Sequence, residues 1–365
     1  MSPPLELRYG LPAADLDLAV ETVATHWKRL DGMDLFFTGG TGFVGAWMSA
    51  VLLHAIDHGL LKARLRLLTR NPDRVRKDHP EIVAHPSVRL VQGDVLQAGW
   101  DCEGATHLIA GATEASAALL KERPRRMLET ILEGTTRTLD LAEKAGISRA
   151  LFVSSGAAAG PQPSEVERVR EDQHFGLDPF SPRIAYAEGK RLAELLFTLH
   201  RQASFSFTSA RLWAFVGPLL PMDSHFAVGN FLGDALSGRK IRILGDGTTV
   251  RSYQYAAEMA AWNLVLLASG RHATAYNVGS DQAVSMRELA SLCAGLGGEA
   301  GYEVLGIPDP SRRTDVYVPD VGRMKDEFGL ENRVGLEAAL QATAAWTHNQ
   351  SLVGARTLGQ TQGQA

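Results

Sequence analysis

Three glycines spaced three residues apart follow a short apolar run near the start of the chain, and they limit its fold more than any other feature. The apolar residues 35–37 lead through Thr38 into Gly39, Gly42 and Gly45, after which helix-forming residues begin. Gly39 permits a tight turn, Gly42 lets backbone amides approach a pyrophosphate, and Gly45 lets the new helix pack close to a sheet. The pattern predicts a strand, a turn and a helix whose N-terminus faces a dinucleotide, although such a turn alone is often only a turn.

Composition and charge narrow the class of protein. The chain has 365 residues, of which 45% are hydrophobic and 21% charged, as in an ordinary α/β enzyme of more than one domain. With a net charge of -4, we expect neither nucleic acid nor an anionic membrane as a partner. Export segments and long apolar runs are not visible, and the two cysteines, Cys102 and Cys293, show no paired spacing. We therefore expect a cytoplasmic protein without disulfides.

Strand-like and helical stretches alternate after the glycine turn, which is the rhythm of a doubly wound parallel sheet. The predicted strands cover residues 63–68, 88–92, 107–110 and 150–153, and the predicted helices cover 46–58, 73–84, 117–145 and 184–203. An amphipathic helix at 14–30 precedes the first strand, and we expect it to brace the sheet. The predicted parts are an N-terminal extension (1–32), a Rossmann domain (33–204), an interleaved substrate lobe (205–348) and a disordered tail (349–365).

The end of the second strand carries the sequence signal for the choice of cofactor. An NAD-binding unit usually has an acidic residue here, but this chain has Thr69 and then Arg70, with Arg74 close behind. Arg70 favours NADP over NAD if it pairs with a 2′-phosphate, and the equally weighted alternative is a solvated arginine. Asp94 follows the third strand and either accepts from the adenine amino group or caps the next turn.

A tyrosine and a lysine four residues apart provide the candidate catalytic pair. Tyr186 and Lys190 fall in a predicted helix, and their spacing places them on one face, one turn apart. A phenol with a reference pKa of about 10 is a poor base, and a neighbouring ammonium would favour its phenolate. Ser155 ends an apolar strand and can hold a substrate hydroxyl or carbonyl while Tyr186 moves the proton.

These elements, in this order, resemble the extended short-chain dehydrogenase/reductase family, in particular its nucleotide-sugar epimerase/dehydratase branch. The resemblance covers roughly residues 33–347 and includes the segment 210–218, the segment 245–247 followed by Arg251 and Tyr253, the segment 276–279, and the segment 312–315 with 319–320. It implies a Rossmann-type fold, an NAD or NADP cofactor, a nucleotide-sugar substrate, and a homodimer formed through the helices around 117–145 and 184–203. The implied cofactor contacts are Gly39, Thr41, Gly42, Phe43, Val44, Gly45, Thr69, Arg70, Asp94, Val95, Ala110, Ala112, Thr113, Ser154, Tyr186 and Lys190, and the implied substrate contacts are Thr113, Ser155, Asn230, Arg251 and Arg312.

One departure from the family pattern bears on the activity. Sugar 4,6-dehydratases carry an Asp-Glu pair directly after the catalytic hydroxyl residue and the related decarboxylase keeps a glutamate there, whereas this chain has Gly156 and Ala157. Because elimination needs a general acid and base within reach, we expect hydride transfer at C4, in an epimerase or a 4-ketoreductase. Glu114 or Glu188 acting from elsewhere keeps a dehydratase or decarboxylase open, and a non-catalytic cofactor-binding regulator is the alternative from another class.

The histidines raise two smaller questions. His54 and His58 have a spacing that can hold zinc on a helix, but neither a glutamate nor a third ligand accompanies them in the sequence, so we expect no metal. His225 lies in the same segment as Asn230, and we expect it to be a polar surface residue.

Overall fold

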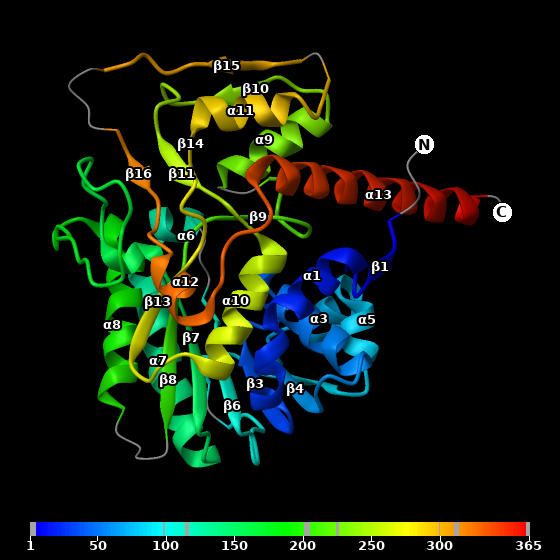
Figure 1. Ribbon diagram of the computed structural model, residues 1–365, viewed down its shortest axis with the longest axis vertical. Coiled ribbons are helices and arrows are strands. Elements are labelled where there is room, and N and C mark those ends of the chain that lie inside the picture. The colour runs from blue at the N-terminus through cyan, green and yellow to red at the C-terminus, as the bar shows by residue number, and fades with distance from the viewer. Residues whose placement is uncertain are drawn as a thin grey trace.

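The computed structural model describes residues 5–97, 99–113, 117–200, 205–223, 226–298, 300–309 and 314–362. Its centre is a parallel sheet of seven strands in the order β13-β8-β7-β6-β3-β4-β5, which confirms the predicted doubly wound α/β fold (Figure 1). The strands are β3 (Met33–Thr38), β4 (Ala63–Thr69), β5 (Val88–Gln92), β6 (His107–Ala110), β7 (Arg149–Ser155), β8 (Ser206–Leu212) and β13 (Thr274–Val278).

Two hydrophobic cores cover the two faces of this sheet. Strand β3 is buried along its whole length, and its side chains alternate between the cores. Leu35 and Phe37 pack in the core that includes α3 (Phe43–Asp57) and α10 (Ala256–Ser269). Phe36 packs in the core under α7 (Pro124–Ala145) and α8 (Ala185–Leu199). A strand buried on both faces explains the continuous apolar run before the first glycine.

Prolines divide two helices that the sequence predicted as continuous. The helix expected at 73–84 is two helices, α4 (Pro72–Asp78) and α5 (Pro80–Ala84), and the one expected at 117–145 is α6 (Ala117–Glu122) followed by α7. Pro80 and Pro124 each occupy the first position of the second helix. Proline has no N–H to donate to the preceding turn, so each helix ends and a new one begins.

The N-terminal extension packs against the Rossmann domain. It contains the strands β1 (Leu7–Arg8) and β2 (Leu11–Pro12) and the helices α1 (Ala13–Val23), η1 (Ala24–His26) and α2 (Trp27–Leu30), so the helix predicted at 14–30 is interrupted at residues 24–26. Leu16, Ala19 and Val23 of α1 are buried in the core that holds α3 and α10. The hydroxyl of Tyr255 also donates to the carboxylate of Asp15 at 2.5 Å.

A smaller lobe lies at one end of the molecule, beyond the sheet (Figure 1). Its chain is interleaved with the Rossmann domain, because α10 and β13 from the same stretch of sequence belong to the large domain. The elements of the lobe and its connections are η2 (Gly156–Ala159), η3 (Pro182–Ile184), β9 (Phe215–Val216), α9 (Ala227–Leu236), β10 (Ile241–Ile243), β11 (Val250–Ser252), β12 (Gln254–Tyr255), β14 (Ala283–Ser285), α11 (Met286–Ala294), β15 (Tyr302–Val304), β16 (Val316–Tyr317) and α12 (Gly322–Phe328).

The last helix differs from the expectation for the end of the chain. Helix α13 runs through Leu336–Gln362, so the backbone is helical where the sequence suggested a disordered tail from residue 349. Its first half is anchored by the buried residues Ala339, Leu340 and Ala344, and a helix that is already nucleated extends at little cost through residues that favour it. Within the described ranges, the helices are all too short or too polar to cross a bilayer.

Candidate active site

The glycine loop is shaped by close backbone contacts at two of its three glycines. Gly39 has a φ of +83°, and a Cβ there would lie 2.6 Å from the carbonyl carbon of Gly111. A Cβ at Gly45 would lie 2.3 Å from the carbonyl oxygen of Gly39, so only glycine lets α3 start this close to the turn. Both findings match the structural roles predicted for these residues.

Gly42 leaves the space that a dinucleotide needs. It is exposed, precedes the first residue of α3, and a Cβ there would meet only the carbonyl oxygen of Gly39, at 3.7 Å. The first amides of α3, at Phe43 and Val44, therefore begin beside open space, with the positive end of the helix dipole towards it. This cradle fits the pyrophosphate of NAD or NADP.

The end of β6 closes the loop from the other side. The hydroxyl oxygen of Thr38 accepts hydrogen bonds from the amides of Gly111 at 3.2 Å and Ala112 at 3.3 Å. These bonds fix residues Ala110 to Thr113 against the glycine turn at the carboxyl edge of the sheet. Ligands bind at this edge in open α/β sheets, and the structure brings the predicted loop and strand-end residues together there.

The candidate catalytic residues converge at the same edge. Lys190 is only 2% exposed, and its Nζ donates to the hydroxyl of Thr113 at 2.9 Å and to the carbonyl oxygen of Val153 at 2.8 Å. One turn earlier on α8, the phenol of Tyr186 lies beside the Ser155 side chain, which opposes the rise that burial causes in its pKa. The structure thus joins Ser155, Tyr186 and Lys190, as the sequence predicted, and adds Thr113 as a direct partner of the lysine.

Burial shifts the pKa values of the Tyr186 phenol and the Lys190 amine in opposite directions. Burial lowers the pKa of Lys190 to about 7, against the attraction of the Glu194 carboxylate. Burial also raises the pKa of Tyr186, and the Ser155 side chain opposes this effect. The lysine therefore changes its charge near neutral pH, and a nicotinamide cation beside the phenol would add a positive charge that favours the phenolate.

A second tyrosine, which the sequence reasoning missed, lies beside Ser155. Tyr317 ends β16, and its phenol lies beside the Ser155 side chain and the Ala157 amide, both of which oppose the rise that burial causes in its pKa. Its ring packs on Trp213, with centroids 4.2 Å apart. A Cβ at Gly156 would lie 2.6 Å from both the Tyr317 hydroxyl and the Trp213 ring, so this glycine makes room for the pair.

Strand pairing in the small lobe carries Arg251 to the same place. Arg251 on β11 is the register partner of Tyr317 on β16, and its guanidinium lies over the tyrosine ring at 5.8 Å. The carboxylate of Asp315 accepts from this guanidinium at 2.7 Å. Asn230 lies in the first turns of α9. Besides Thr113 and Ser155, Arg251 is therefore a predicted substrate residue that the structure connects to the catalytic group.

A buried ion pair holds α8 against the sheet, and the sequence analysis missed it as well. Glu194 of α8 accepts from Arg211 of β8 at 2.8 Å, from Ser154 at 2.7 Å and from Ser209 at 3.0 Å. Burial alone would raise the pKa of the Glu194 carboxyl, but the hydrogen bonds from Arg211 hold it below its usual value. Because Ser154 donates to this carboxylate, its hydroxyl is already engaged, and the cofactor contact predicted for Ser154 is left to its backbone.

The remaining predicted residues occupy positions around this edge. Arg70 is exposed directly after β4 and Thr69, whereas Arg74 is paired with Asp78 at 3.1 Å. Asp94 accepts from the Leu96 amide at 3.0 Å, which is the turn-capping role left open above. The side chain of Val95 packs so close to Gly134 of α7 that a Cβ there would touch it, and Thr41 is part of the glycine loop. Glu188 forms an ion pair with Arg191 at 3.4 Å. Glu114, His225 and Arg312 lie outside the described residues.

Comparison with known proteins identifies the family. A model described as the NAD dependent epimerase/dehydratase family matches residues 35–279. The chain belongs to this family, and the resemblance noted in the sequence is confirmed. UDP-glucuronic acid decarboxylase 1 of Xenopus tropicalis is 29% identical over 86% of this chain and 72% of its own length. UDP-glucuronic acid decarboxylase 6 of Arabidopsis thaliana is 28% identical over 84% of this chain and 87% of its own length.

Solved structures share the fold. A UDP-glucose 4-epimerase from Thermotoga maritima aligns with a TM-score of 0.71 at 22% identity, over 87% of this chain and 99% of its own. A dTDP-glucose 4,6-dehydratase from Streptomyces venezuelae aligns with a TM-score of 0.73 at 23% identity, over 87% of this chain and 97% of its own. These similarities support the Rossmann-like architecture, which does not by itself define an activity.

Proposed function

We propose that this chain is an NAD-using enzyme that oxidises C4 of a nucleoside diphosphate sugar. The observation that carries the proposal is the group made by Ser155, Tyr186 and Lys190 at the sheet edge, beside the cradle formed by the glycine loop and α3. A binding protein has no need of a buried lysine that lies one helical turn from a phenol. The non-catalytic regulator is therefore the weaker alternative.

Each residue of the group has a separate task in this proposal. The cofactor, when bound, supplies the hydride acceptor and donor. Tyr186 takes the proton of the sugar hydroxyl as its oxygen becomes a ketone, and Ser155 holds that oxygen by a hydrogen bond. Lys190 orients Thr113 and supplies positive charge when protonated. Arg251, fixed by Asp315, lies where it can bind a phosphate of the substrate.

We propose a hexuronate as the sugar and decarboxylation as the fate of the C4 ketone. The curated relatives described above are UDP-glucuronic acid decarboxylases. A C5 carboxylate is β to a C4 ketone, so carbon dioxide leaves as its bonding electrons move into the ketone, and no base has to remove the C5 proton. This chain lacks the glutamate that the related decarboxylase keeps after the catalytic hydroxyl residue, but loss of carbon dioxide needs no base at C5, whereas elimination of the C6 hydroxyl needs both an acid and a base where Gly156 and Ala157 stand.

On the evidence of these relatives, we propose decarboxylation as the activity in preference to the C4 epimerase or 4-ketoreductase that the sequence favoured. After loss of carbon dioxide, C5 needs one proton, and C4 needs the hydride back together with a proton on its oxygen. Tyr186 returns to the C4 oxygen the proton that it took during the oxidation. The second proton comes from solvent, and the phenol of Tyr317, beside Ser155, is the group proposed to deliver it to C5. Epimerisation at C4 remains the second candidate, because the same group supports hydride removal and return without any loss of carbon.

The choice between NAD and NADP rests on Arg70. The family is described as NAD dependent, which supports NAD. Arg70 lies exposed at the end of β4, where the sequence suggested a contact with a 2′-phosphate. Titration of NAD and NADP into the wild type and into Arg70→Ala tests this contact. A loss of affinity for NADP alone supports a contact between Arg70 and the 2′-phosphate. Equal affinities in the two proteins would show that Arg70 does not determine the choice of cofactor.

The activity is tested with a panel of nucleotide sugars that includes hexuronates, hexoses and N-acetylhexosamines. We expect the wild type to release carbon dioxide from a nucleoside diphosphate hexuronate, with a nicotinamide absorbance change in single turnover, and Tyr186→Phe to lose both signals. If the enzyme instead forms a C4-epimerised product and releases no carbon dioxide, the activity is epimerisation and not decarboxylation. Equal inertness of the wild type and Tyr186→Phe across the panel would remove the enzyme proposal.

A further inference from the structure

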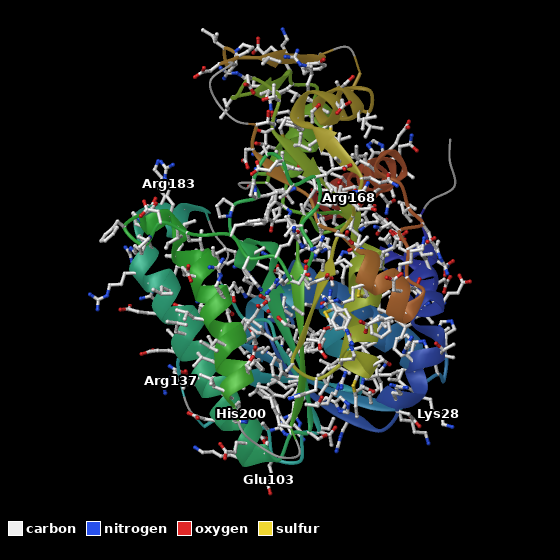
Figure 2. All side chains as sticks on the ribbon, turned by 60° about the vertical axis from the view of Figure 1, so that its left-hand side comes forward. Lys28, Glu103, Arg137, Arg168, Arg183 and His200 are labelled. Atoms are coloured by element: carbon white, nitrogen blue, oxygen red, sulfur yellow. The ribbon has the colours of Figure 1, made fainter. Side chains whose placement is uncertain are left out.

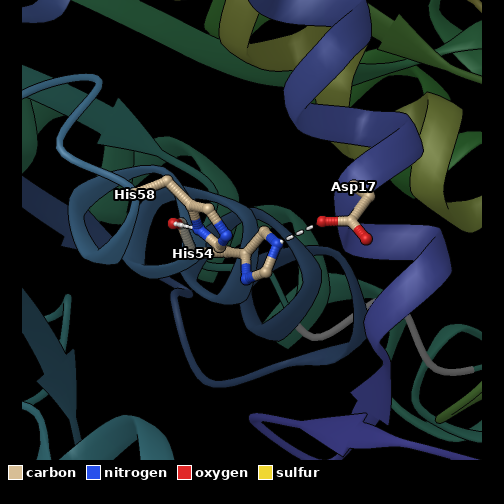
Figure 3. A group of neighbouring side chains, drawn as sticks. All are labelled: Asp17, His54 and His58. Carbon is tan, nitrogen blue, oxygen red and sulfur yellow. Dashed lines mark hydrogen bonds and ion pairs between the residues drawn. The ribbon is translucent and has the colours of Figure 1, made fainter.

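The N-terminal extension brings a third metal-ligating side chain to the two histidines of α3. The sequence argued against a metal because His54 and His58 lacked another ligand nearby. In the structure, α1 places Asp17 against α3, and Nε2 of His54 lies 2.7 Å from Oδ1 of Asp17 (Figure 3). One ligand atom from each of the three side chains lies within 4.8 Å of the others. Asp17 is 37 residues from His54, so spacing along the chain gave no signal of this group.

The ring of His58 is already held in the orientation of a metal ligand. Its Nδ1 donates to the backbone carbonyl of His54 at 2.8 Å, one turn earlier on the helix. In a neutral imidazole this leaves Nε2 as the nitrogen with the free lone pair. Metal-bound histidines usually donate their second nitrogen in this way, which fixes both the tautomer and the ring. The two imidazole rings are 4.2 Å apart between centroids, as one helical turn allows.

We propose that Asp17, His54 and His58 form a zinc site that fastens the N-terminal extension to α3. Two imidazole nitrogens and one carboxylate oxygen suit Zn²⁺, whereas Mg²⁺ and Ca²⁺ prefer oxygen donors alone. Three protein ligands leave one position for water in a tetrahedral site. Asp17 and His58 are exposed, so the ion has a path to the site, and the buried His54 provides a fixed anchor.

Two features of the surroundings bear on how strongly the site binds. Asp57 lies next to His58 in the sequence and accepts from His85 at 3.1 Å, and its carboxylate adds negative charge close to His54. Against this, zinc on Nε2 of His54 leaves the ring proton on Nδ1, which is buried without a hydrogen-bond partner in the described part of the chain. An unpaired buried donor is costly, so we expect a site that exchanges its metal with chelators and not a permanently occupied one.

The site is tested on the full-length chain made without a histidine tag and treated with EDTA. Isothermal titration with ZnCl₂ should give one ion per chain, and saturating zinc should raise the melting temperature by roughly 2–5 °C, since an ion that binds only the folded chain stabilises it. MgCl₂ at the same concentration should change neither signal. Absence of stoichiometric zinc binding would overturn the proposal.

Two conservative variants at exposed positions identify the ligands without disturbing the core. His58→Gln and Asp17→Asn should each weaken zinc binding about tenfold or more. Asp17→Asn keeps an oxygen acceptor for His54, so the contact between α1 and α3 is preserved. His348→Gln, at an exposed histidine on α13, is the matched control and should bind like the wild type. Unchanged affinity in either test variant would contradict the three-residue site.

Discussion

The amine of Lys190 lies in a position that favours its neutral form. Its two partners, the Thr113 hydroxyl and the Val153 carbonyl, are uncharged, and burial lowers its pKa to about 7 from the ordinary value of a lysine. The unfolded chain therefore binds more protons than the folded chain between about pH 7 and pH 10. The stability contributed by this position should rise with pH across that window.

Lys190→Met separates the catalytic and electrostatic roles of the residue. We expect activity to fall by ~10²-fold or more, because the charge beside Tyr186 is lost. We also expect the difference in free energy of unfolding, wild type minus variant, to move in favour of the wild type by up to ~1.4 kcal/mol per pH unit between pH 7 and pH 10. Chemical denaturation at several pH values measures it, and a difference independent of pH would contradict the buried-lysine argument.

Tyr317→Phe tests whether the second phenol acts on Ser155. The ring stays packed on Trp213, and only the hydroxyl that lies beside Ser155 is removed. Since a hydrogen bond between two hydroxyls is worth ~0.5–1.5 kcal/mol, kcat should fall about 3- to 10-fold while the melting temperature stays close to that of the wild type. Steady-state kinetics measure the change in kcat, and a thermal melt measures the melting temperature. An unchanged kcat would mean that the hydroxyl only fills space.

Residues that meet across long stretches of sequence are the ones that sequence reasoning could not find. Tyr186 and Lys190 are four residues apart, so helix periodicity alone predicted their common face. Tyr317 reaches Ser155 through the pairing of β16 with β11, and Asp17 reaches His54 through helix packing. Neither contact has a spacing signal. The one hint for Tyr317 was its place between segments that carried the family resemblance.

At the scale of elements, local signals were sufficient where a glycine or a proline decided the backbone. The glycine loop and the start of α3 could be predicted from three residues. The breaks before α5 and α7 were not predicted, although Pro80 and Pro124 are local signals for them. The small lobe could not be predicted in the same way. Its strands are two or three residues long and find partners far along the chain, so they leave no periodic pattern.

Helix α10 contains a buried carboxyl that joins it to the segment before α13. Glu258 is 1% exposed, and its Oε1 accepts from the amides of Arg333 and Val334. Burial raises the pKa of Glu258 to about 7, although these hydrogen bonds oppose the shift. The unfolded chain loses this proton more readily than the folded chain, so wild-type stability falls as pH rises from about 4.5 to 7.

Glu258→Gln should therefore stabilise the protein at alkaline pH. Glutamine keeps an oxygen acceptor for the two amides and carries no charge to bury. We expect a gain of ~1–3 kcal/mol in the free energy of unfolding at pH 8 and little difference near pH 5, where the wild-type carboxyl is protonated in the folded chain. Urea denaturation at the two pH values tests this. Equal stability of the two proteins at pH 8 would contradict it.

At the scale of the whole molecule, the proposed active site is assembled from two parts of the fold. The sheet, with α3 and α8, supplies the glycine loop, Ser155, Tyr186 and Lys190, and the small lobe supplies Arg251 and Tyr317. A ligand that contacts both sets must lie between the lobes. Helix α8 is central to this arrangement, because its inner face carries the reactive pair and the Glu194 anchor while its outer face points away from the sheet.

The outer face of α8 carries an apolar stripe that we propose as a dimer interface. Leu192, Leu195 and Leu199 are 39%, 49% and 57% exposed, and their spacing places them along one side of the helix. Helices α7 and α8 run together along one side of the molecule in Figure 2, where Arg137, Arg183 and His200 are labelled. Exposed apolar stripes of this kind are typical of protein interfaces, and two copies of the helix pair would cover both stripes in a symmetric four-helix bundle.

Charging this stripe should separate the subunits. We expect the wild type to have twice the chain mass of 39.4 kDa by light scattering, and the double variant with Leu192→Glu and Leu195→Glu to have the mass of one chain, because four carboxylates cannot be buried together. Leu60→Glu, at a leucine that is 44% exposed and outside the helix pair, is the matched control and should remain dimeric. A monomeric wild type, or a double variant that stays dimeric, would place the interface elsewhere and leave the stripe on α8 without a partner.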